Sequence, residues 1–199
     1  MKVKPILVYS VPKRRPQSSW RNWGGIETQE QADEEVKRIQ GELNQLKATA
    51  DFPVEFLPVA AVQRALELND MPEVTGADTL LVFAAGGGTG DYNAIGNFKK
   101  DTILFVRHKS GPVYLWYEIV SPRYLRQHTD TLKTVGIDDQ DVVVDRMDEV
   151  LWRLRALCGL KNTIGSRIVA IGGLAGWAQP NDAIAKLVQE RWKLDVRAV

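Results

Sequence analysis

Four glycines in five residues form the stretch of this chain that is best suited to hold a ligand. They follow the apolar run from Thr79 to Ala85, and Asp91 comes directly after them. Glycine lets the backbone turn sharply or approach a ligand closely, because no Cβ stands in the way. Such a loop can offer backbone amides to an anion or a sugar, and the alternative is a tight turn that binds nothing. The candidate binding residues here are Gly86, Gly87, Gly88, Thr89, Gly90 and Asp91.

A second candidate binding segment is the irregular loop predicted over residues 12–26. It mixes basic residues with aromatic ones, and we single out Arg14, Trp20 and Trp23. A guanidinium group forms forked hydrogen bonds with anionic groups, and an indole presents a large flat face to a sugar ring or a base. The loop would leave the carboxyl end of the first strand, and long loops of this kind carry function more often than average. The alternative is that its tryptophans pack on the domain or on another subunit.

The elements that must position these loops alternate between strand and helix. Alternation of this kind predicts a parallel sheet with helices on both faces, so we expect a three-layer Rossmann-like or flavodoxin-like α/β fold. We expect one such domain over residues 1–199. The predicted strands cover residues 3–11, 54–57, 79–85, 102–106, 112–120, 142–144, 167–171 and 194–199. The predicted helices cover residues 28–50, 60–68, 91–98, 121–132 and 146–160, and a last helix begins at residue 180.

The first predicted helix begins with a capping motif. Thr28 is followed three residues later by Gln31, which is the spacing of a capping box. An apolar stripe then repeats along the helix at Val36, Ile39, Leu43 and Leu46. We interpret the charged residues 33–38 as the solvated face of this helix.

Composition and charge exclude several classes of function. Lys and Arg number 26 and Asp and Glu number 25, so the chain has no basic surplus to attract a nucleic acid. The single cysteine, Cys158, excludes an intrachain disulfide, and its helical spacing from Leu151 and Leu154 places it in a core. No stretch has the length of a membrane span or the features of a signal peptide. We therefore expect a cytoplasmic protein without a membrane partner.

The common catalytic and nucleotide-binding motifs do not fit this sequence. The G-x-G-x-x-G frame would need glycine at position 91 or 93, where Asp91 and Asn93 stand, and there is no P-loop or nucleophile elbow. His108 ends a predicted strand, where catalytic groups are often found, so it joins the candidate binding residues; the alternative is an exposed loop histidine. With only one other histidine, His128, the sequence predicts no metal site and no catalytic residue.

Several segments together resemble the N-terminal domain of L-fucose and L-arabinose isomerase-like proteins. These are the opening strand with its long loop, the strand of residues 77–83, and the helix around residues 148–151 that leads to residues 167–173. The resemblance covers nearly the whole chain. It implies a Rossmann-like domain that helps to build a sugar pocket and contacts other copies in a homo-oligomer.

The same resemblance implies where the chemistry would take place. The metal-binding carboxylates and the histidine, usually with Mn2+, belong to a later domain, so no cofactor and no catalytic residue is transferred to this chain. The leading hypothesis is an aldose–ketose isomerase-related domain, and whether this chain is itself an enzyme is open. The alternatives are a non-enzymatic sugar-binding module and a nucleotide-dependent enzyme that uses the glycine loop.

Overall fold

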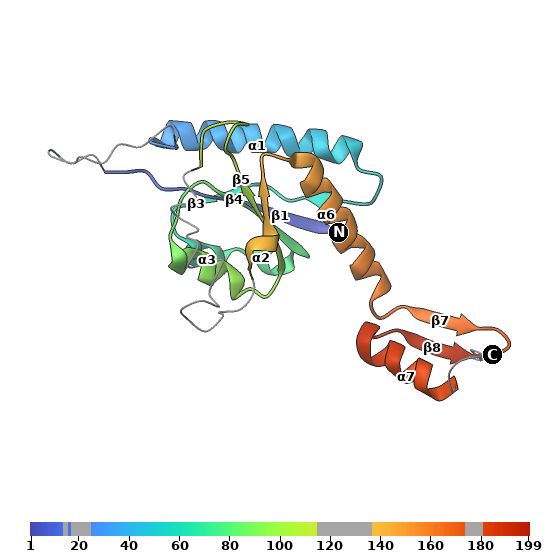
Figure 1. The fold of residues 1–199 in the computed structure, drawn as a ribbon. Coiled ribbons are helices and arrows are strands. Elements are labelled where there is room, and N and C mark those ends of the chain that lie inside the picture. The colour runs from blue at the N-terminus through green and yellow to red at the C-terminus, as the bar shows by residue number, and fades with distance from the viewer. Residues whose placement is uncertain (14–15, 17–24, 115–136, 174–180) are drawn as a thin grey trace. The chain divides into compact units, whose positions relative to one another are not determined.

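The computed structural model describes residues 1–13, 16, 25–114, 137–173 and 181–199, which form two compact units (Figure 1). The first unit is Met1–Leu151 and the second is Trp152–Val199. Helix α6 (Met147–Thr163) begins in the first unit and continues in the second. Whether the two units make one domain stays a prediction.

A six-stranded parallel sheet forms the centre of the first unit. On one edge, β1 (Lys2–Val8) pairs with β4 (Thr79–Ala84), which pairs with β5 (Asp101–Val106), and β5 pairs with β6 (Val142–Val144). On its other edge, β1 pairs with two short strands, β2 (Glu55–Phe56) and β3 (Ala60–Val62). Every one of these pairings is parallel, so the predicted α/β class with a parallel sheet is confirmed.

Both faces of the central strands are buried. Successive side chains of a strand point to opposite faces, and all six residues of β4 are buried. In Figure 1, α1 (Gln29–Thr49) lies along one side of the sheet, and α2 (Pro72–Gly76) and α3 (Thr89–Gly96) lie on the other. Strands of a parallel sheet that is covered in this way are continuous apolar runs in the sequence, which is why β4 could be predicted.

Helix α1 begins as predicted, but one of its charged residues is buried. The Thr28 hydroxyl accepts from the Gln31 N–H at 3.2 Å, and Gln31 Oε1 accepts from the Thr28 N–H at 3.2 Å, which confirms the capping box. Glu35 is only 2% exposed, so its assignment to the solvated face is wrong. It follows Ala32 by three residues and precedes Ile39 by four, which places it on the buried side of the helix.

Residues 60–76 differ from the prediction of a helix followed by a break. Residues 60–62 are strand β3, with Ala60 and Val62 buried and Ala61 exposed. A 3-10 helix, η1 (Ala65–Asp70), follows, and Pro72 then begins α2. The spacing of the apolar residues in this segment is compatible with a helix. Residues 60–62 form a strand instead because they pair with Ile6–Val8.

Two further predictions fall near or within residues that lie outside the described ranges. Residues 112–114 of the predicted 112–120 strand are not in a strand. The rest of that strand and the 121–132 helix lie outside the described residues. Among the helices of the described ranges, none is long and apolar enough to cross a bilayer.

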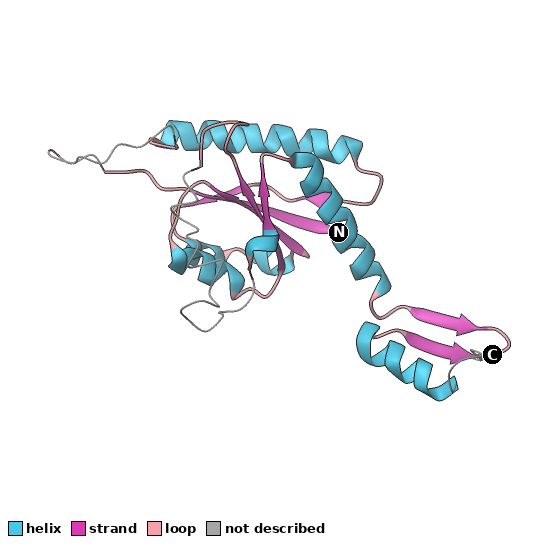
Figure 2. Cartoon of the chain, in the orientation of Figure 1, coloured by secondary structure: helices cyan, strands magenta, loops and turns pink. Residues whose placement is uncertain are grey.

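The second unit contains a strand–helix–strand segment (Figure 2). Strand β7 (Arg167–Ala170) pairs in parallel with β8 (Asp195–Ala198), and α7 (Asn181–Trp192) lies between them in the chain. Gly172 and Gly173, which follow β7, have φ angles of 85° and 95°. Only glycine adopts such angles freely, so these two residues let the chain turn as it leaves the strand. Cys158 in α6 is 4% exposed, as its spacing predicts.

Candidate functional site

The strand order directs attention to the carboxyl ends of β1 and β4. The short strands β2 and β3 pair with the same edge of β1 and can be counted as one strand. The positions across the sheet are then β2/β3, β1, β4, β5 and β6, which is the order 2-1-3-4-5 when the positions are numbered along the chain. After β1 the chain continues to β2 on one side, and after β4 it continues to β5 on the other side. The connections from the neighbouring strands β1 and β4 therefore run in opposite directions. In open α/β sheets, ligands bind outside the carboxyl ends of the strands at such a switch point. Both predicted binding segments start at this edge.

The first glycine of the loop is needed because the end of β1 lies against it. A Cβ built at Gly86 would lie 2.5 Å from the backbone N of Ser10 and 2.6 Å from the carbonyl carbon of Tyr9. The Gly86 carbonyl also accepts a 2.7 Å hydrogen bond from the buried Tyr92 hydroxyl. The close approach that glycine permits here is therefore made by the chain's own backbone.

The next two glycines donate their amides to side chains of the same protein. Gly87, with φ at 88°, donates to Ser10 Oγ at 3.2 Å, and Gly88 donates to Asp91 Oδ2 at 2.9 Å. The other oxygen of Asp91 accepts from the Ala65 N–H at 2.9 Å. Asp91 therefore holds the loop and the start of η1 in place. Thr89 and Gly90 are exposed in the first turn of α3, and ligand binding at this loop stays a prediction.

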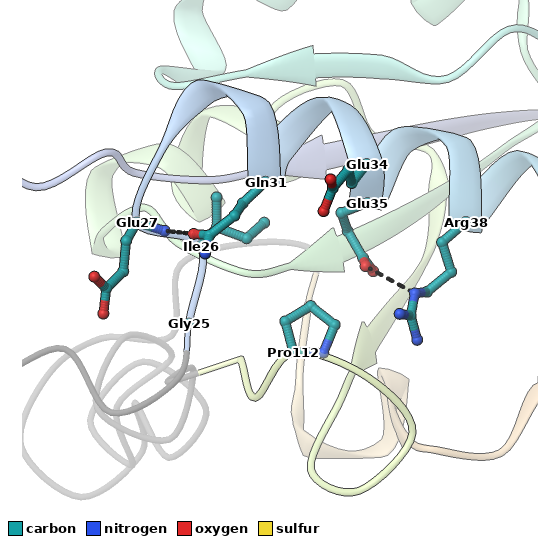
Figure 3. Close-up of a pocket in the computed structure, with 8 residues that line it drawn as sticks. All are labelled: Gly25, Ile26, Glu27, Gln31, Glu34, Glu35, Arg38 and Pro112. Carbon is teal, nitrogen blue, oxygen red and sulfur yellow. Dashed lines mark hydrogen bonds and ion pairs between the residues drawn. The ribbon is translucent and has the colours of Figure 1, made fainter.

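A pocket of about 460 Å³ lies between the first half of α1 and the loop after β5 (Figure 3). Both segments follow the carboxyl ends of strands, so the pocket lies at the edge of the sheet where ligands are expected. Its lining residues are Gly25, Ile26, Glu27, Gln31, Glu34, Glu35, Arg38 and Pro112. Residues 86–91 and His108 do not line it, and Arg14, Trp20 and Trp23 lie outside the described residues.

Most polar side chains of the pocket lie on α1, and Glu27 lies just before the N-cap of that helix. Glu34 and Glu35 are neighbours on α1, and Pro112 lies across from them in Figure 3. Gln31 Oε1 accepts from the N–H groups of Glu27, at 2.6 Å, and Thr28, so it shapes the pocket by fixing the helix start. The side chain of Arg38 is half exposed, and that of Glu35 is buried.

Behind the pocket, a buried network ties Glu35 to the loop after β5. Arg107 Nε donates to Glu35 Oε1 at 2.6 Å, and Arg107 Nη2 donates to Glu42 at 2.7 Å. The Tyr114 hydroxyl donates to the same Glu35 oxygen at 2.5 Å. The Arg107 guanidinium also lies 5.3 to 5.9 Å from the centres of three aromatic rings, which favours its charge. Those rings belong to Phe83, Phe105 and Tyr114.

The protonation of this network follows from its charges. Burial alone would lower the pKa of Arg107, but the hydrogen bond to Glu42 and the nearby acidic groups raise it above its ordinary value. Burial, together with the Glu35 carboxylate, raises the pKa of Tyr114 well above its ordinary value. Arg107 therefore stays charged, and Tyr114 keeps the proton that it donates to Glu35.

His108, in the loop after β5, is exposed, as the alternative for this residue supposed. Its backbone N–H and those of Lys109 and Ser110 donate to the Asp145 carboxylate at 2.8 to 3.0 Å. The Ser110 hydroxyl donates to the same carboxylate at 2.6 Å. Asp145 directly follows β6, so its side chain fastens the ends of two neighbouring strands together.

We expect Asp145→Asn to remove part of the pH dependence of stability. Partial burial opposes the shift, but the Ser110 hydroxyl and the three N–H groups lower the pKa of Asp145 to about 2. Because the folded pKa is depressed, the carboxylate stabilises the fold above about pH 4, and this stabilisation is lost as the pH falls toward 2. Because the group is partly solvated, this stabilisation amounts to about 1 kcal/mol. Asparagine tolerates the φ of 58° at this position.

Urea unfolding at a series of pH values between 7 and 2 checks this prediction. The free energy of unfolding of the wild type should fall by about 1 kcal/mol more than that of Asp145→Asn over the range from pH 5 to 2. Equal slopes for the two proteins would show that the carboxylate does not fasten the strands.

Most residues that line and support the pocket are not among those that the sequence motifs point to. The helical pattern predicts a solvated position for Glu35, and the motifs include neither Arg107 nor Tyr114. A signal was present for Glu35, since a charged residue on the apolar stripe of a helix needs a buried partner. Arg107 directly follows a buried strand, and a charged residue at such a position is a second indication of a buried ion pair.

No protein-family model matches this chain, and no curated protein matches it significantly. Within the described ranges, no three His, Cys, Asp or Glu side chains are placed to hold a metal ion. The function of the site is therefore argued from its geometry and charges.

Proposed function

We propose that this chain binds a small uncharged sugar in the pocket between α1 and Pro112, as a domain of an aldose–ketose isomerase-like protein. The observation that supports this most directly is the lining of the pocket, in which carboxylates stand beside one guanidinium at the carboxyl edge of a parallel sheet. A sugar hydroxyl can donate to a carboxylate and accept from a guanidinium at the same time. The glycine loop stays a candidate contact at the same edge, and binding by the segment 12–26, most of which lies outside the described residues, stays a prediction.

The charges of the lining favour a free sugar over a phosphorylated one. Among the described residues, three glutamates and one arginine line the pocket, and Arg107 balances the charge of Glu35 from behind. A phosphate group placed here would meet the carboxylates of Glu27 and Glu34 as well as the guanidinium of Arg38. Like charges brought together in a partly dry pocket disfavour binding.

The described residues provide no set of metal ligands, so no metal-dependent step of an aldose–ketose conversion is assigned to them. The part proposed for this chain is to bind and orient the sugar.

Thermal unfolding in the presence of sugars tests the proposal. We expect L-arabinose or L-fucose at ten times its Kd to stabilise the fold by about 1.4 kcal/mol, which for a chain of this size raises Tm by about 2–4 °C per kcal/mol. Pentose phosphates at equal concentration should leave Tm unchanged. The lack of a shift with any free sugar would contradict the proposal.

A pair of neighbouring variants shows whether the sugar occupies this pocket. Glu34→Gln removes a lining carboxylate, and we expect it to weaken sugar binding about tenfold, as loss of a charged hydrogen-bond partner does. Asp33→Asn is the matched control, because it removes the same charge one residue away and Asp33 does not line the pocket. Titration calorimetry on both variants measures the effect, and equal affinities would place the sugar elsewhere.

An activity assay distinguishes the proposed isomerase role from its alternatives. The 199-residue chain, and a version that includes any sequence encoded after Val199, should be tested for Mn2+-dependent aldose–ketose conversion. Sugar binding without turnover in either form favours a non-enzymatic binding module. A rise in Tm with nucleotides instead of sugars favours the nucleotide-dependent alternative at the glycine loop.

A further inference from the structure

We infer that Glu35 is the residue that accepts a sugar hydroxyl in the pocket, and that Arg107 and Tyr114 are positioning residues that hold its carboxylate for this purpose. This inference rests on the proposed function. It goes further by naming the contact that orients the sugar and the two side chains that fix it.

The two oxygens of Glu35 are in different situations. Oε1 accepts from Arg107 at 2.6 Å and from the Tyr114 hydroxyl at 2.5 Å, which are short, charge-assisted hydrogen bonds. Oε2 lies 3.5 Å from Arg38 Nε, a distance at which little hydrogen-bond energy is gained. One oxygen is therefore committed to the protein core, and the other retains capacity as an acceptor at the pocket wall.

The carboxylate cannot turn away from the pocket. The side chain of Glu35 is 1% exposed, that of Arg107 is fully buried, and Tyr114 is 1% exposed. Two donors that bind one oxygen from a buried position fix the plane of the carboxylate. A rigid acceptor loses little entropy when a ligand binds, which is the advantage of a preorganised site.

Arg38 provides the movable partner of this contact. Its side chain is half exposed, and its Nη1 lies 3.4 Å from the Ser110 carbonyl oxygen, so it is held more loosely than Arg107. Figure 3 shows Arg38 reaching toward Glu35 at the pocket wall. A sugar hydroxyl that enters between them would donate to Glu35 Oε2 and accept from Arg38.

Two variants of the same network separate positioning from structural support. Tyr114→Phe keeps the ring and removes the hydroxyl that binds Glu35, and Glu42→Gln removes the other carboxylate partner of Arg107. Tyr114→Phe removes the hydrogen bond to Glu35 and a 3.3 Å contact with Arg107 Nε, whereas Glu42→Gln weakens only the contact with Arg107 Nη2 and leaves the contacts of Glu35 in place. Binding of L-arabinose and L-fucose should be measured by calorimetry at a temperature at which circular dichroism shows each variant to be folded.

We expect Tyr114→Phe to weaken sugar binding about tenfold and Glu42→Gln to change it less than threefold. Glu35→Gln, which keeps the size of the side chain, should weaken binding by more than tenfold. If the wild type binds either sugar and all three variants bind it equally well, the inference is wrong and the proposed function stands. If Tyr114→Phe and Glu42→Gln weaken binding equally, Tyr114 is not a positioning residue. If the wild type binds neither sugar, the proposed function fails and this inference with it.

Discussion

Replacing Arg107 with methionine is expected to lower the free energy of unfolding by about 3–5 kcal/mol, which is the usual cost of removing one partner of a buried ion pair. Glu35, whose side chain is 1% exposed, would lose the closer of its two cations and keep the half-exposed Arg38 at 3.5 Å. Glu42 is 26% exposed and can be partly hydrated, so most of the cost arises at Glu35. Urea unfolding at pH 7, followed by circular dichroism, measures the loss. Domains are stable by only about 5–15 kcal/mol, so the midpoint should move substantially.

Two further variants show whether burial is the cause. Arg146→Met breaks an ion pair with Asp148 of the same 2.7 Å length, but both side chains are more than 60% exposed. Exposed pairs contribute about 0–1 kcal/mol, so this control should unfold close to the wild type. Arg107→Met combined with Glu35→Met removes both buried charges and should recover part of the loss. If Arg107→Met costs no more than Arg146→Met, the network does not stabilise the fold.

The sequence was sufficient to predict the parallel α/β fold because that fold depends on local patterns. The run from Leu80 to Ala84 is apolar throughout, as a strand covered on both faces requires. The valines at 142–144 form a strand with the predicted limits, and Thr28 caps α1 through Gln31 as its spacing indicates. Each of these signals is contained within a few residues.

The pocket could not be predicted in the same way, because its parts are distant in the chain. Glu35 and Arg107 are 72 residues apart, and nothing near Glu35 in sequence indicates its partner. Pro112 reaches the pocket only because β5 lies in the same sheet as β1, with β4 between them. The strand at residues 60–62 was missed for the same reason, since its pairing with Ile6–Val8 outweighs the local preference of a short apolar run.

We expect Gly86→Ala to lower the free energy of unfolding by about 1–3 kcal/mol, the usual cost of forcing an extra methyl group into a packed site. The added Cβ would meet three backbone atoms of Tyr9 and Ser10 within 2.8 Å. A side chain can rotate away from such a clash, but these atoms belong to the end of β1, whose position is fixed by pairing with β4. The substitution should also disturb the hydrogen bond from Gly87 to Ser10. Urea unfolding measures the change.

Gly90→Ala is the matched control for this prediction, and its effect should have the opposite sign. Gly90 lies four residues later in the first turn of α3, and a Cβ there would meet nothing within 4 Å. Alanine in a helix loses less backbone entropy on folding than glycine, so this variant should gain up to about 0.5–1 kcal/mol. If both substitutions destabilise the protein equally, the cost at Gly86 does not come from the contact with β1. If neither does, the loop is free to move away from β1, and Gly86 is not required for the close approach of the two strand ends.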